Sequence, residues 1–474
     1  MTPAISLSHD SLTALLEAAR SFDFWATPSH VPGLPASDPR NDQSISNPTI
    51  GSLLEHNNGV RKLEELIAVA RGAKRAWPLV NGSTGGNQIA MLSLAWSQPS
   101  PKVLVAGNCH HSVLNAAMSY GVPLRFLPAY MLSGFDAMLP PTAEDVRAAL
   151  DRDRSVTAVM ITAPTYEGLQ PDISAIADVA HDHGLPLIVD AAWGAHFGYH
   201  PLLAPAAATT GADVVIESLH KTGGAAQGCA TILHGGPYLD ESTIEASFTA
   251  LVTTSPSFTL LSTIEWALTA LTTSGEEHLQ APIDQARRLR DGLRERGLPV
   301  LDHDLLADAT KVTFGGVDGF AVKDLLFKRG IVIEKASCCS ALMLATMQLE
   351  AGAADRALSI IDEILPAIVD ANVASGRLGD VRSHRAIPVA WLTDHPVVEA
   401  HEAVRGLATE TVPTADAVGR VAAEIVELYP PGVPVLAPGW VIHSDALDEL
   451  ERARAAGGRI VARDRSLNTV LVLS

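Results

Sequence analysis

Short apolar runs alternate with amphipathic stretches through the middle of the chain. The runs are rich in Val, Ile and Ala and are bounded by turn-forming residues, which is typical of buried strands. They fall at 103–107, 156–163, 186–191, 213–217 and 229–233. Segments with helical spacing lie between several of them, at 87–96, 142–150 and 172–183. This order of strands and helices predicts an α/β fold with a mostly parallel sheet that is covered on both faces.

The flanking segments differ from this middle part and divide the chain. Residues 25–50 are rich in Pro, Asp, Asn and Ser, and predict an extended arm after a short first helix. A charged segment that begins near residue 275 predicts a long surface helix leading into a smaller domain. The expected parts are an N-terminal helix and arm (1–50), a large domain (51–274), a small domain (275–395) and a C-terminal α+β domain (396–474).

The composition is that of a large, well-packed protein. The 474 residues are 47% hydrophobic and 18% charged, with a formal net charge of −19. Such an acidic chain is a poor partner for nucleic acid, and no apolar run reaches the roughly 18 residues that a membrane span needs. The N-terminus lacks the pattern of a secretory signal. Only four cysteines are present, so neither a disulfide framework nor a metal site is expected. We therefore expect a cytoplasmic protein that acts on a small molecule.

Polar, chemically able side chains follow the predicted strands. Residues 108–111 (Asn-Cys-His-His) follow the first run, Asp190 comes near the end of the third, and residues 218–221 (Ser-Leu-His-Lys) follow the fourth. A Gly-rich turn at 81–86 (Asn-Gly-Ser-Thr-Gly-Gly) opens a predicted helix. Ligands of open parallel sheets bind outside the carboxyl ends of the strands. We therefore expect these groups on one rim of the sheet.

Together these groups suit the binding of pyridoxal 5'-phosphate (PLP). Lys221, desolvated at the rim, could carry the cofactor as a Schiff base. Asp190 could pair with the protonated pyridine nitrogen and keep the ring an electron sink, and His110 could stack on the ring. The helix that follows the Gly-rich turn offers unpaired N–H groups to a phosphate. The residues that could contribute donors to the phosphate are Ser83, Thr84, Gly85, Ser218 and His220.

Each of these signals has an ordinary structural explanation when taken alone. A Gly-rich turn before a helix is common, Asp190 could cap a helix, and Lys221 could be a solvated charge. Their order and spacing within one α/β unit favour the PLP site.

Six stretches of the chain stand out as a set. They read LVNGSTGGN (79–87), NCHHSVLNA (108–116), TAPTYEGLQPDISAIADVAHDHGLPLIVDAAWGAHFGYHPLL (162–203), GADVVIESLHKT (211–222), TTSPSFTLL (253–261) and AVGRVAAEIVELYPPGVPVLAPGWVI (417–442). In this order they resemble the prokaryotic ornithine/lysine/arginine decarboxylase family, in its short form without an N-terminal receiver-like domain. The last stretch is similar to the family's C-terminal domain.

This resemblance implies a large domain of the aspartate-aminotransferase-like fold, which is fold type I among PLP enzymes, in a homodimer or higher oligomer. It assigns the Schiff base to Lys221, the pyridine partner to Asp190 and the stacking ring to His110. It also implies that Ala192 packs under the cofactor ring and that Ser255 lies near the neighbouring subunit's cofactor. The implied reaction is decarboxylation of a basic amino acid (arginine, lysine or ornithine), a step of polyamine metabolism.

The positions expected to face the substrate depart from the family pattern. His111 stands where a Lys is common, and Ser337 stands where a small-domain Glu-x-x-Asp would end in Asp. Glu167 and Glu334 are candidates for meeting a cationic substrate end, and Trp193 is a candidate for shaping the pocket.

These departures leave the reaction open. Other PLP chemistry on an amino acid, such as oxidative deamination, elimination or transamination, is an alternative to decarboxylation. A catalytically silent regulatory partner is a minor alternative. Trp193 and Trp440 could both simply fill the core.

Overall fold

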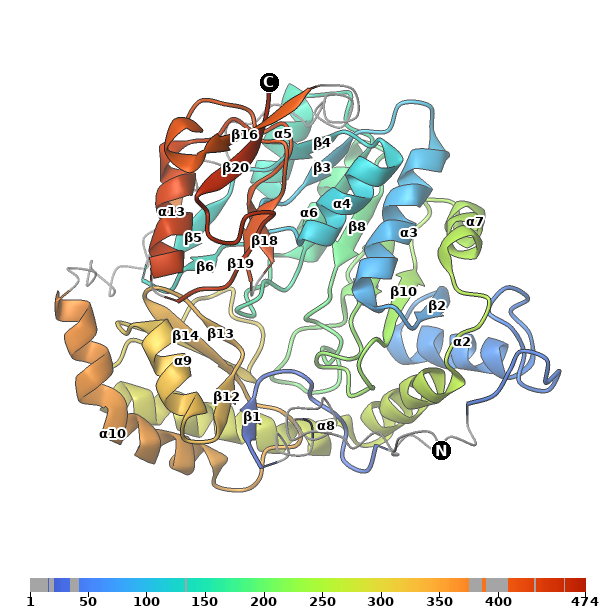
Figure 1. Ribbon diagram of the computed structural model, residues 1–474. Helices are drawn as coiled ribbons and strands as arrows, with labels where there is room; N and C mark the ends of the chain where they lie inside the picture. Colours follow the sequence, from blue (N-terminus) through green and yellow to red (C-terminus); the bar gives the residue numbers. More distant parts are fainter. Residues whose placement is uncertain are drawn as a thin grey trace, which may run out of the picture.

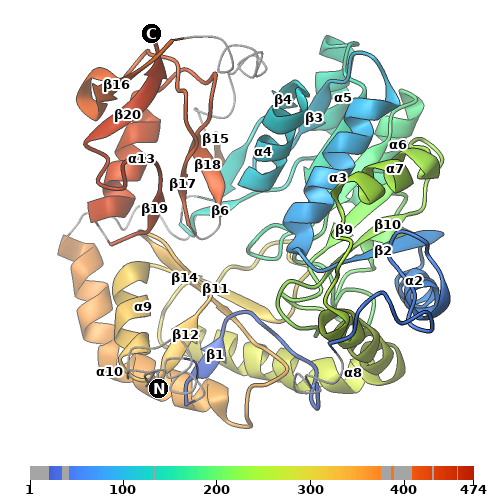
Figure 2. The ribbon, with the colours of Figure 1, turned by 45° about the vertical axis from the view of Figure 1, so that its right-hand side comes forward.

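The structure is a computed structural model that describes residues 16, 21–34, 42–132, 134–374, 386–388, 408–429, 432–455 and 457–474. The predicted first helix lies almost entirely outside these residues. Three parts surround a common centre: the large domain, a small domain built on the end of a long helix, and a C-terminal α+β part (Figure 2).

A seven-stranded sheet forms the middle of the large domain (Figure 1). The strand order is β2-β10-β9-β8-β7-β3-β4, and within this sheet β10 runs antiparallel to both neighbours. The five predicted strands are present, and the mostly parallel sheet is confirmed. Residues that sequence reasoning left out add a strand at each edge. In sequence order the strands are β2 (Arg75–Leu79), β3 (Val103–Val105), β4 (Leu124–Phe126), β7 (Ala158–Thr162), β8 (Leu187–Asp190), β9 (Val214–Glu217) and β10 (Ala230–His234).

Helices cover both faces of this sheet, as predicted. α3 packs between α4 and α7 on one face, and α5 and α6 pack together on the other (Figure 1). α3 begins inside the Gly-rich turn, because Gly82 adopts φ +73°, a conformation that costs glycine little. The helices are α2 (Asn58–Arg71), α3 (Gly82–Ser97), α4 (His111–Tyr120), α5 (Ala143–Arg152), α6 (Ile173–Asp182), α7 (Glu241–Leu251) and α8 (Phe258–Glu295).

The long helix α8 connects the large domain to the small domain. It starts well before the predicted surface helix, and its backbone leaves helical geometry at Ser274. β1 of the N-terminal arm pairs in parallel with β12, which ties the arm to the small domain. The small domain has its own apolar core between α8, α9, α10 and its strands. Its elements are β1 (Asp23–Trp25), β11 (Lys311–Gly315), α9 (Gly319–Phe327), β12 (Ile331–Ile333), β13 (Lys335–Ala336), β14 (Ser340–Leu344) and α10 (Ala353–Ala374).

The C-terminal part is an α+β unit with a separate core, as predicted. Trp440 is buried against the large domain, where its ring lies perpendicular to that of Phe126 with the centroids 5.1 Å apart, so it fills core. A further small sheet joins β15 to a hairpin of the large domain. Among the residues described, no helix is both long and apolar enough to cross a membrane. The remaining elements are β5 (Tyr130–Leu132), β6 (Ala137–Met138), β15 (Ala386–Pro388), β16 (Thr409–Pro413), β17 (Val426–Leu428), β18 (Val433–Leu436), α13 (Ser444–Ala455), β19 (Ile460–Val461) and β20 (Thr469–Leu473).

Candidate active site

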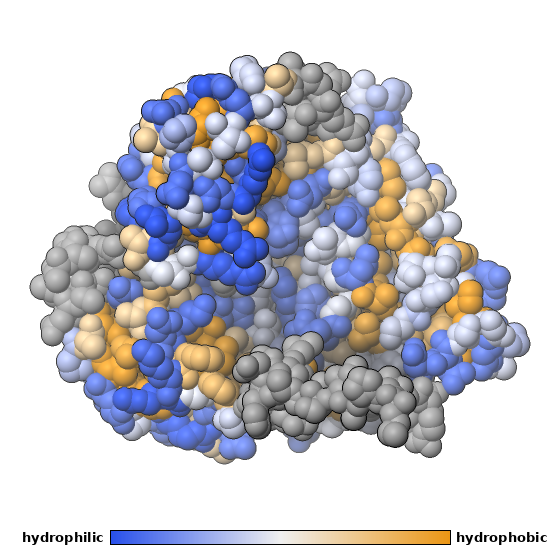
Figure 3. Space-filling model, viewed as in Figure 1, coloured by the Kyte–Doolittle hydropathy of each residue, from blue (hydrophilic) through white to orange (hydrophobic). Residues whose placement is uncertain are grey.

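A cavity of about 770 Å³ lies at the carboxyl edge of the sheet and is lined by all three parts of the molecule. Hydrophilic residues gather in the recess between these parts (Figure 3). Most of the residues proposed from the sequence line this cavity. They are Ser83, Thr84, His110, Glu167, Asp190, Ala192, Trp193, His220, Lys221 and Glu334.

Three proposed residues do not line it. Gly85 is buried in the first turn of α3, where an added Cβ would lie 2.3 Å from the Asn81 side chain. Ser218 is fully buried, and its hydroxyl has no hydrogen-bond partner within the described chain. Ser255 is exposed in the loop between α7 and α8, so its predicted role depends on a second subunit.

Asp190 ends the central strand β8 and is 2% exposed. Its Oδ2 accepts a hydrogen bond from Asn87 Nδ2 at 2.9 Å, and its Oδ1 accepts one from the Ala192 backbone N–H at 3.1 Å. Burial raises the pKa of this carboxyl group, while the Asn87 hydrogen bond and nearby Lys221 oppose the shift. A buried carboxylate with neutral donors is suited to hold a cationic ring nitrogen.

His110 caps the N-terminus of α4 and lies at the cavity wall. Its Nδ1 accepts a hydrogen bond from the Ser112 backbone N–H at 3.2 Å and lies 2.8 Å from the Ser112 hydroxyl. Burial lowers the pKa of His110 to about 3, with smaller contributions from His111 and Lys221. The imidazole is therefore neutral at physiological pH, and an uncharged ring is suited to stack on an aromatic cofactor.

Lys221 follows β9 and carries an ammonium group 4.4 Å from the centroid of the Trp193 ring. Burial lowers the pKa of Lys221 to about 8, and Lys311 adds to this effect, whereas Asp190 and Glu334 oppose it. The amine is therefore partly neutral near physiological pH, which a lysine needs in order to attack a carbonyl carbon.

Lys311 is a second buried lysine that contacts the Trp193 ring. Its Nζ lies 4.1 Å from the Trp193 ring centroid and donates a hydrogen bond to the Tyr166 carbonyl at 2.7 Å. The same Nζ forms an ion pair with Asp308 at 3.8 Å. Trp193 thus lines the cavity and contacts two lysines, and its role in shaping the pocket stays a prediction.

The start of α3 supplies the donors expected for a phosphate. Ser83 and Thr84 line the cavity beside His220, and the N-cap residue Asn81 makes no side-chain cap hydrogen bond. The first N–H groups of a helix have no partner within the helix, so they are available to an anion. His220 is fixed by a 2.8 Å contact of its Nδ1 with the Cys229 carbonyl, and burial lowers its pKa.

The two glutamates proposed to face the substrate have different partners. Glu167 is 2% exposed, and its Oε1 pairs with Lys335 Nζ at 2.5 Å. Glu334 accepts hydrogen bonds from the Tyr166 hydroxyl at 2.6 Å and from the Thr27 backbone N–H at 2.7 Å. Lys335 neutralises Glu167, while both of these donors to Glu334 are uncharged. Glu334 is thus the better candidate for attracting a cation.

The C-terminal part contributes one wall of the cavity. Glu427 of β17 lies 2.7 Å from His111 Nδ1, and the Gly432 carbonyl accepts a hydrogen bond from the His111 backbone N–H at 3.0 Å. Gly432, with φ +82°, also lies against His110, since an added Cβ would be 3.1 Å from its Nε2. The departure from the family pattern at His111 therefore coincides with a contact between domains.

Sequence reasoning missed several residues that the fold brings to this site. Asn87 and Ser112 lie within quoted motifs, but nothing local shows that they meet Asp190 and His110. The others are Tyr166, Lys311 and Lys335, whereas Asn108 was expected on the rim but was given no role. The roles of these residues depend on contacts between segments that are distant in the sequence. The sequence could at most have indicated Lys311 and Lys335, which are the first residues of β11 and β13.

The residues present fit PLP. They provide an uncapped helix N-terminus for the phosphate, a neutral imidazole for the ring, a buried carboxylate for the pyridine nitrogen and a lysine with a lowered pKa for the aldehyde. Asn108, 8% exposed in the same cavity, has an amide side chain without a partner in the described residues. The fold and the site together define the class of fold-type-I PLP enzymes.

The chain belongs to the Orn/Lys/Arg decarboxylase family. The model of the family's major domain matches residues 39–310, and the model of its C-terminal domain matches residues 390–457. This confirms the resemblance seen in the sequence and identifies the chain as a PLP-dependent decarboxylase by family.

Similar proteins cover most of the chain. It is 25% identical over 411 residues to the arginine decarboxylase of Bacillus subtilis (84% of this chain, 82% of the relative). It is 26% identical over 439 residues to the arginine decarboxylase of Bacillus anthracis (89% and 86%). The structure of the constitutive lysine decarboxylase of Escherichia coli superimposes with a TM-score of 0.71 at 22% identity, covering 100% of this chain and 80% of that one. The last similarity confirms the fold.

Proposed function

We propose that this protein decarboxylates a basic amino acid (arginine, lysine or ornithine) with PLP held by Lys221, releasing an amine and CO2. The observation that supports this most strongly is the arrangement of Lys221, Asp190 and His110 around one cavity, in a chain of this decarboxylase family. The names of the similar proteins include both arginine and lysine decarboxylases, so the substrate is part of the proposal.

PLP, when bound, withdraws electrons from the substrate's Cα so that CO2 can leave. The residues described above have separate tasks. Lys221 would bind the cofactor covalently, Asp190 would hold a proton on the pyridine nitrogen, and His110 would cover one ring face. Ala192 lines the cavity beside Asp190 and would pack against the other face. Ser83, Thr84 and His220 would hold the phosphate, together with the first N–H groups of α3.

A cationic substrate end is favoured by the charge that remains in the outer cavity. Glu334 accepts its hydrogen bonds from the uncharged donors of Tyr166 and Thr27, and Asp136 and Glu449 line the same space. Glu449 is paired with Arg452 at 2.5 Å, so its charge is already compensated. A substrate cation beside Glu334 would supply the opposite charge that its two uncharged donors do not. Glu167 is already paired with a lysine, so we assign it a structural task.

We further propose a cytoplasmic homodimer or higher oligomer, in which Ser255 approaches the neighbouring subunit's cofactor. The exposed position of Ser255 is compatible with such a contact. Light scattering of the purified protein, with and without PLP, tests the assembly. A monomer under both conditions would exclude the role of Ser255.

The proposed reaction is tested by incubating the purified protein with PLP and arginine, lysine, ornithine or a wider amino-acid pool, and identifying the products by mass spectrometry. We expect one basic amino acid to yield an amine lighter by CO2. Lys221→Ala should give no product, and Lys62→Ala, at an exposed lysine of α2, should match the wild type. A keto or dehydrated product would instead establish the alternative PLP chemistry.

A further inference from the structure

A buried chain of hydrogen bonds connects Asp190 to His110 through two residues that have no assigned role. Asn87 Nδ2 donates to Asp190 Oδ2 at 2.9 Å and to Ser112 Oγ at 2.9 Å. Ser112 Oγ lies 2.8 Å from His110 Nδ1. Asn87 is 1% exposed and Ser112 is 2% exposed, so water does not compete for these bonds.

The direction of each bond in the chain can be assigned. The Ser112 backbone N–H donates to His110 Nδ1, so this nitrogen is an acceptor and the ring proton lies on Nε2. Because Nδ1 carries no proton, the Ser112 hydroxyl is the donor in its 2.8 Å contact with Nδ1, and its oxygen accepts from Asn87. The Asn87 amide directs both of its protons into the chain.

The orientation of Asn87 leaves its Oδ1 buried and without a partner in the described chain. A flipped amide would place Oδ1 against the Asp190 oxygen, where two acceptors would repel each other. Leaving a buried acceptor unpaired costs free energy. An ionised Asp190 oxygen accepts the Asn87 proton more strongly than a neutral one does, which offsets part of this cost. The hydrogen bond from Asn87 therefore favours the charged form of Asp190.

We propose that Asn87 and Ser112 are positioning residues, which keep Asp190 ionised for the pyridine nitrogen of the cofactor and fix His110 as the Nε2–H tautomer. This inference rests on the proposed function, since it assigns Asp190 and His110, the two ends of the hydrogen-bond chain, to one cofactor. The same hydrogen bonds would therefore set two properties that PLP needs from the protein: a negatively charged partner for its pyridine nitrogen and a neutral imidazole for its ring.

Other charged and titratable groups lie around these hydrogen bonds, but they do not replace the effect of Asn87 and Ser112 on Asp190 and His110. Lys221 faces both Asp190 and His110, and the Cys109 thiol lies close to Asp190. His111 lies against His110 with ring centroids 4.1 Å apart. Among these groups, Asn87 is the side chain that donates a hydrogen bond to Asp190.

The test uses the purified full chain loaded with PLP, and compares Asn87→Leu and Ser112→Ala with the wild type. Two quantities are measured: the Kd for PLP and the pH dependence of the visible absorbance of bound PLP. The matched control is Ser93→Ala, since Ser93 is a fully buried serine on α3 whose hydroxyl donates to the Ile89 carbonyl. Circular dichroism verifies that each variant folds.

We expect Asn87→Leu to weaken PLP binding at least about tenfold, because a charge-assisted hydrogen bond to Asp190 is lost. The pH midpoint of the absorbance should shift, since the pyridine nitrogen loses its ionised partner. Ser112→Ala should shift the spectrum with a smaller loss of affinity, because the Asn87–Asp190 bond remains. Ser93→Ala should change neither quantity.

Wild-type affinity and an unshifted midpoint in both variants would overturn the inference while leaving the proposed function intact. Failure of the wild type to bind PLP would instead contradict the proposed function itself. If Asn87→Leu does not fold, Asn87→Ser takes its place with the same expected results, because a serine hydroxyl is too short to reach Asp190.

Discussion

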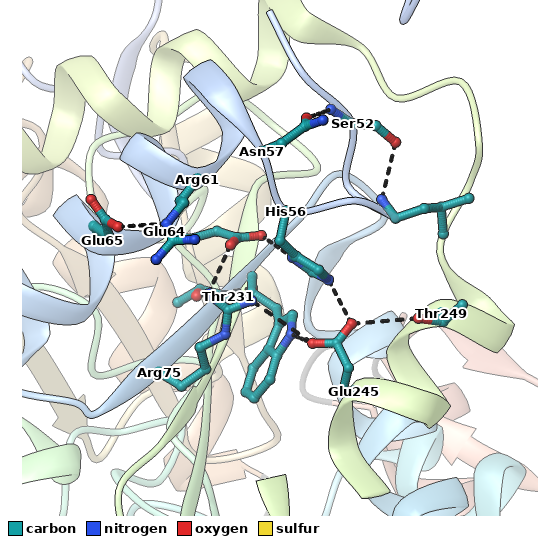
Figure 4. Close-up of polar contacts among 12 residues, drawn as sticks. Ser52, His56, Asn57, Arg61, Glu64, Glu65, Arg75, Thr231, Glu245 and Thr249 are labelled. Atoms are coloured by element: carbon teal, nitrogen blue, oxygen red, sulfur yellow. Dashed lines mark hydrogen bonds and ion pairs between the residues drawn. The ribbon is translucent and has the colours of Figure 1, made fainter. Parts of the chain in front are cut away.

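Two polar regions of the large domain carry histidine or lysine side chains with perturbed pKa values, and the causes are opposite. Around His56, the ring lies 2.6 Å from Glu64 and 2.5 Å from Glu245, and these hydrogen bonds raise its pKa to about 9 (Figure 4). At the cavity, burial lowers the pKa of Lys221 to about 8. The first region stabilises a charge through partners, and the second destabilises a charge through desolvation.

This difference helps to separate structural from catalytic groups. In the His56 region Arg75 also donates to Glu64 at 2.9 Å, and Trp77 donates to Glu245 at 2.8 Å, so each charge has a partner. The reactive groups at the cavity instead have neutral donors or aromatic contacts. A shifted pKa alone does not identify an active site, but the direction of the shift and its cause do distinguish these two regions.

Apart from the complete loss expected for Lys221→Ala, the largest effect on catalysis is expected at Asp190. Asp190→Asn keeps the shape of the side chain and removes its charge, so the cofactor nitrogen would lose its partner. We expect kcat to fall at least about a hundredfold, which corresponds to ~2.7 kcal/mol of barrier. Steady-state amine formation measures this. Because the buried charge is lost at the same time, the melting temperature should hardly fall, and a stable enzyme with wild-type kcat would contradict the assigned role.

The largest effect on stability is expected at a fully paired buried group. Arg71 donates to Glu217 through Nε at 2.9 Å and Nη2 at 2.7 Å, with both side chains buried. Arg71→Met would leave Glu217 buried without its partner and should lower the free energy of unfolding by about 3–5 kcal/mol. Urea unfolding measures this. Combining it with Glu217→Leu should recover most of the loss; no recovery would mean that packing, not charge, causes it.

A smaller, pH-dependent effect is expected at His56. Its pKa is raised from 6.5 in the unfolded chain to about 9 in the folded protein, so its stabilisation is complete below pH 6.5. It is lost as the pH rises through 9. Partial exposure limits the contribution to about 1–2 kcal/mol. His56→Gln should therefore destabilise the protein at pH 6 and have little effect at pH 10, as measured by urea unfolding. Equal losses at both pH values would argue against an ionic contribution.

The smallest effect is expected at Gly432. Gly432→Ala should displace His110 and weaken PLP binding several-fold, besides the ~1 kcal/mol that a left-handed alanine costs. Gly419→Ala is the matched control, since Gly419 has φ +81° and nothing within 4 Å of an added Cβ. It should lower stability equally and leave the Kd for PLP unchanged. Equal losses of PLP affinity in both variants would mean that the contact of Gly432 with His110 does not contribute to PLP binding.

The strands of the sheet interior could be predicted because each is a local apolar run with turn residues beside it. The same reasoning did not predict β2, whose Arg75 and Pro78 interrupt the apolar pattern, or the antiparallel direction of β10. The latter depends on pairing with β2, which lies far away in the sequence. Local patterns also could not place the first half of α8, which is partly buried.

In the candidate site, too, some residues could be predicted from local sequence and others could not. Asp190 and Lys221 could be proposed because strand ends share one rim. The pairing of Glu167 with Lys335, and of His111 with Glu427, links residues 168 and 316 positions apart, and no local pattern specifies such contacts. The roles assigned from the sequence to the individual site residues stay predictions until the cofactor is bound.

Covalent trapping tests the central claim most directly. The protein is incubated with PLP, reduced with borohydride and digested, and the modified peptide is identified by mass spectrometry. The account predicts a pyridoxyl group on Lys221 and none on Lys311, whose ammonium is held by Tyr166 and Asp308. A pyridoxyl group on Lys311 or another lysine, or none at all, would contradict the assignment of Lys221 as the cofactor lysine.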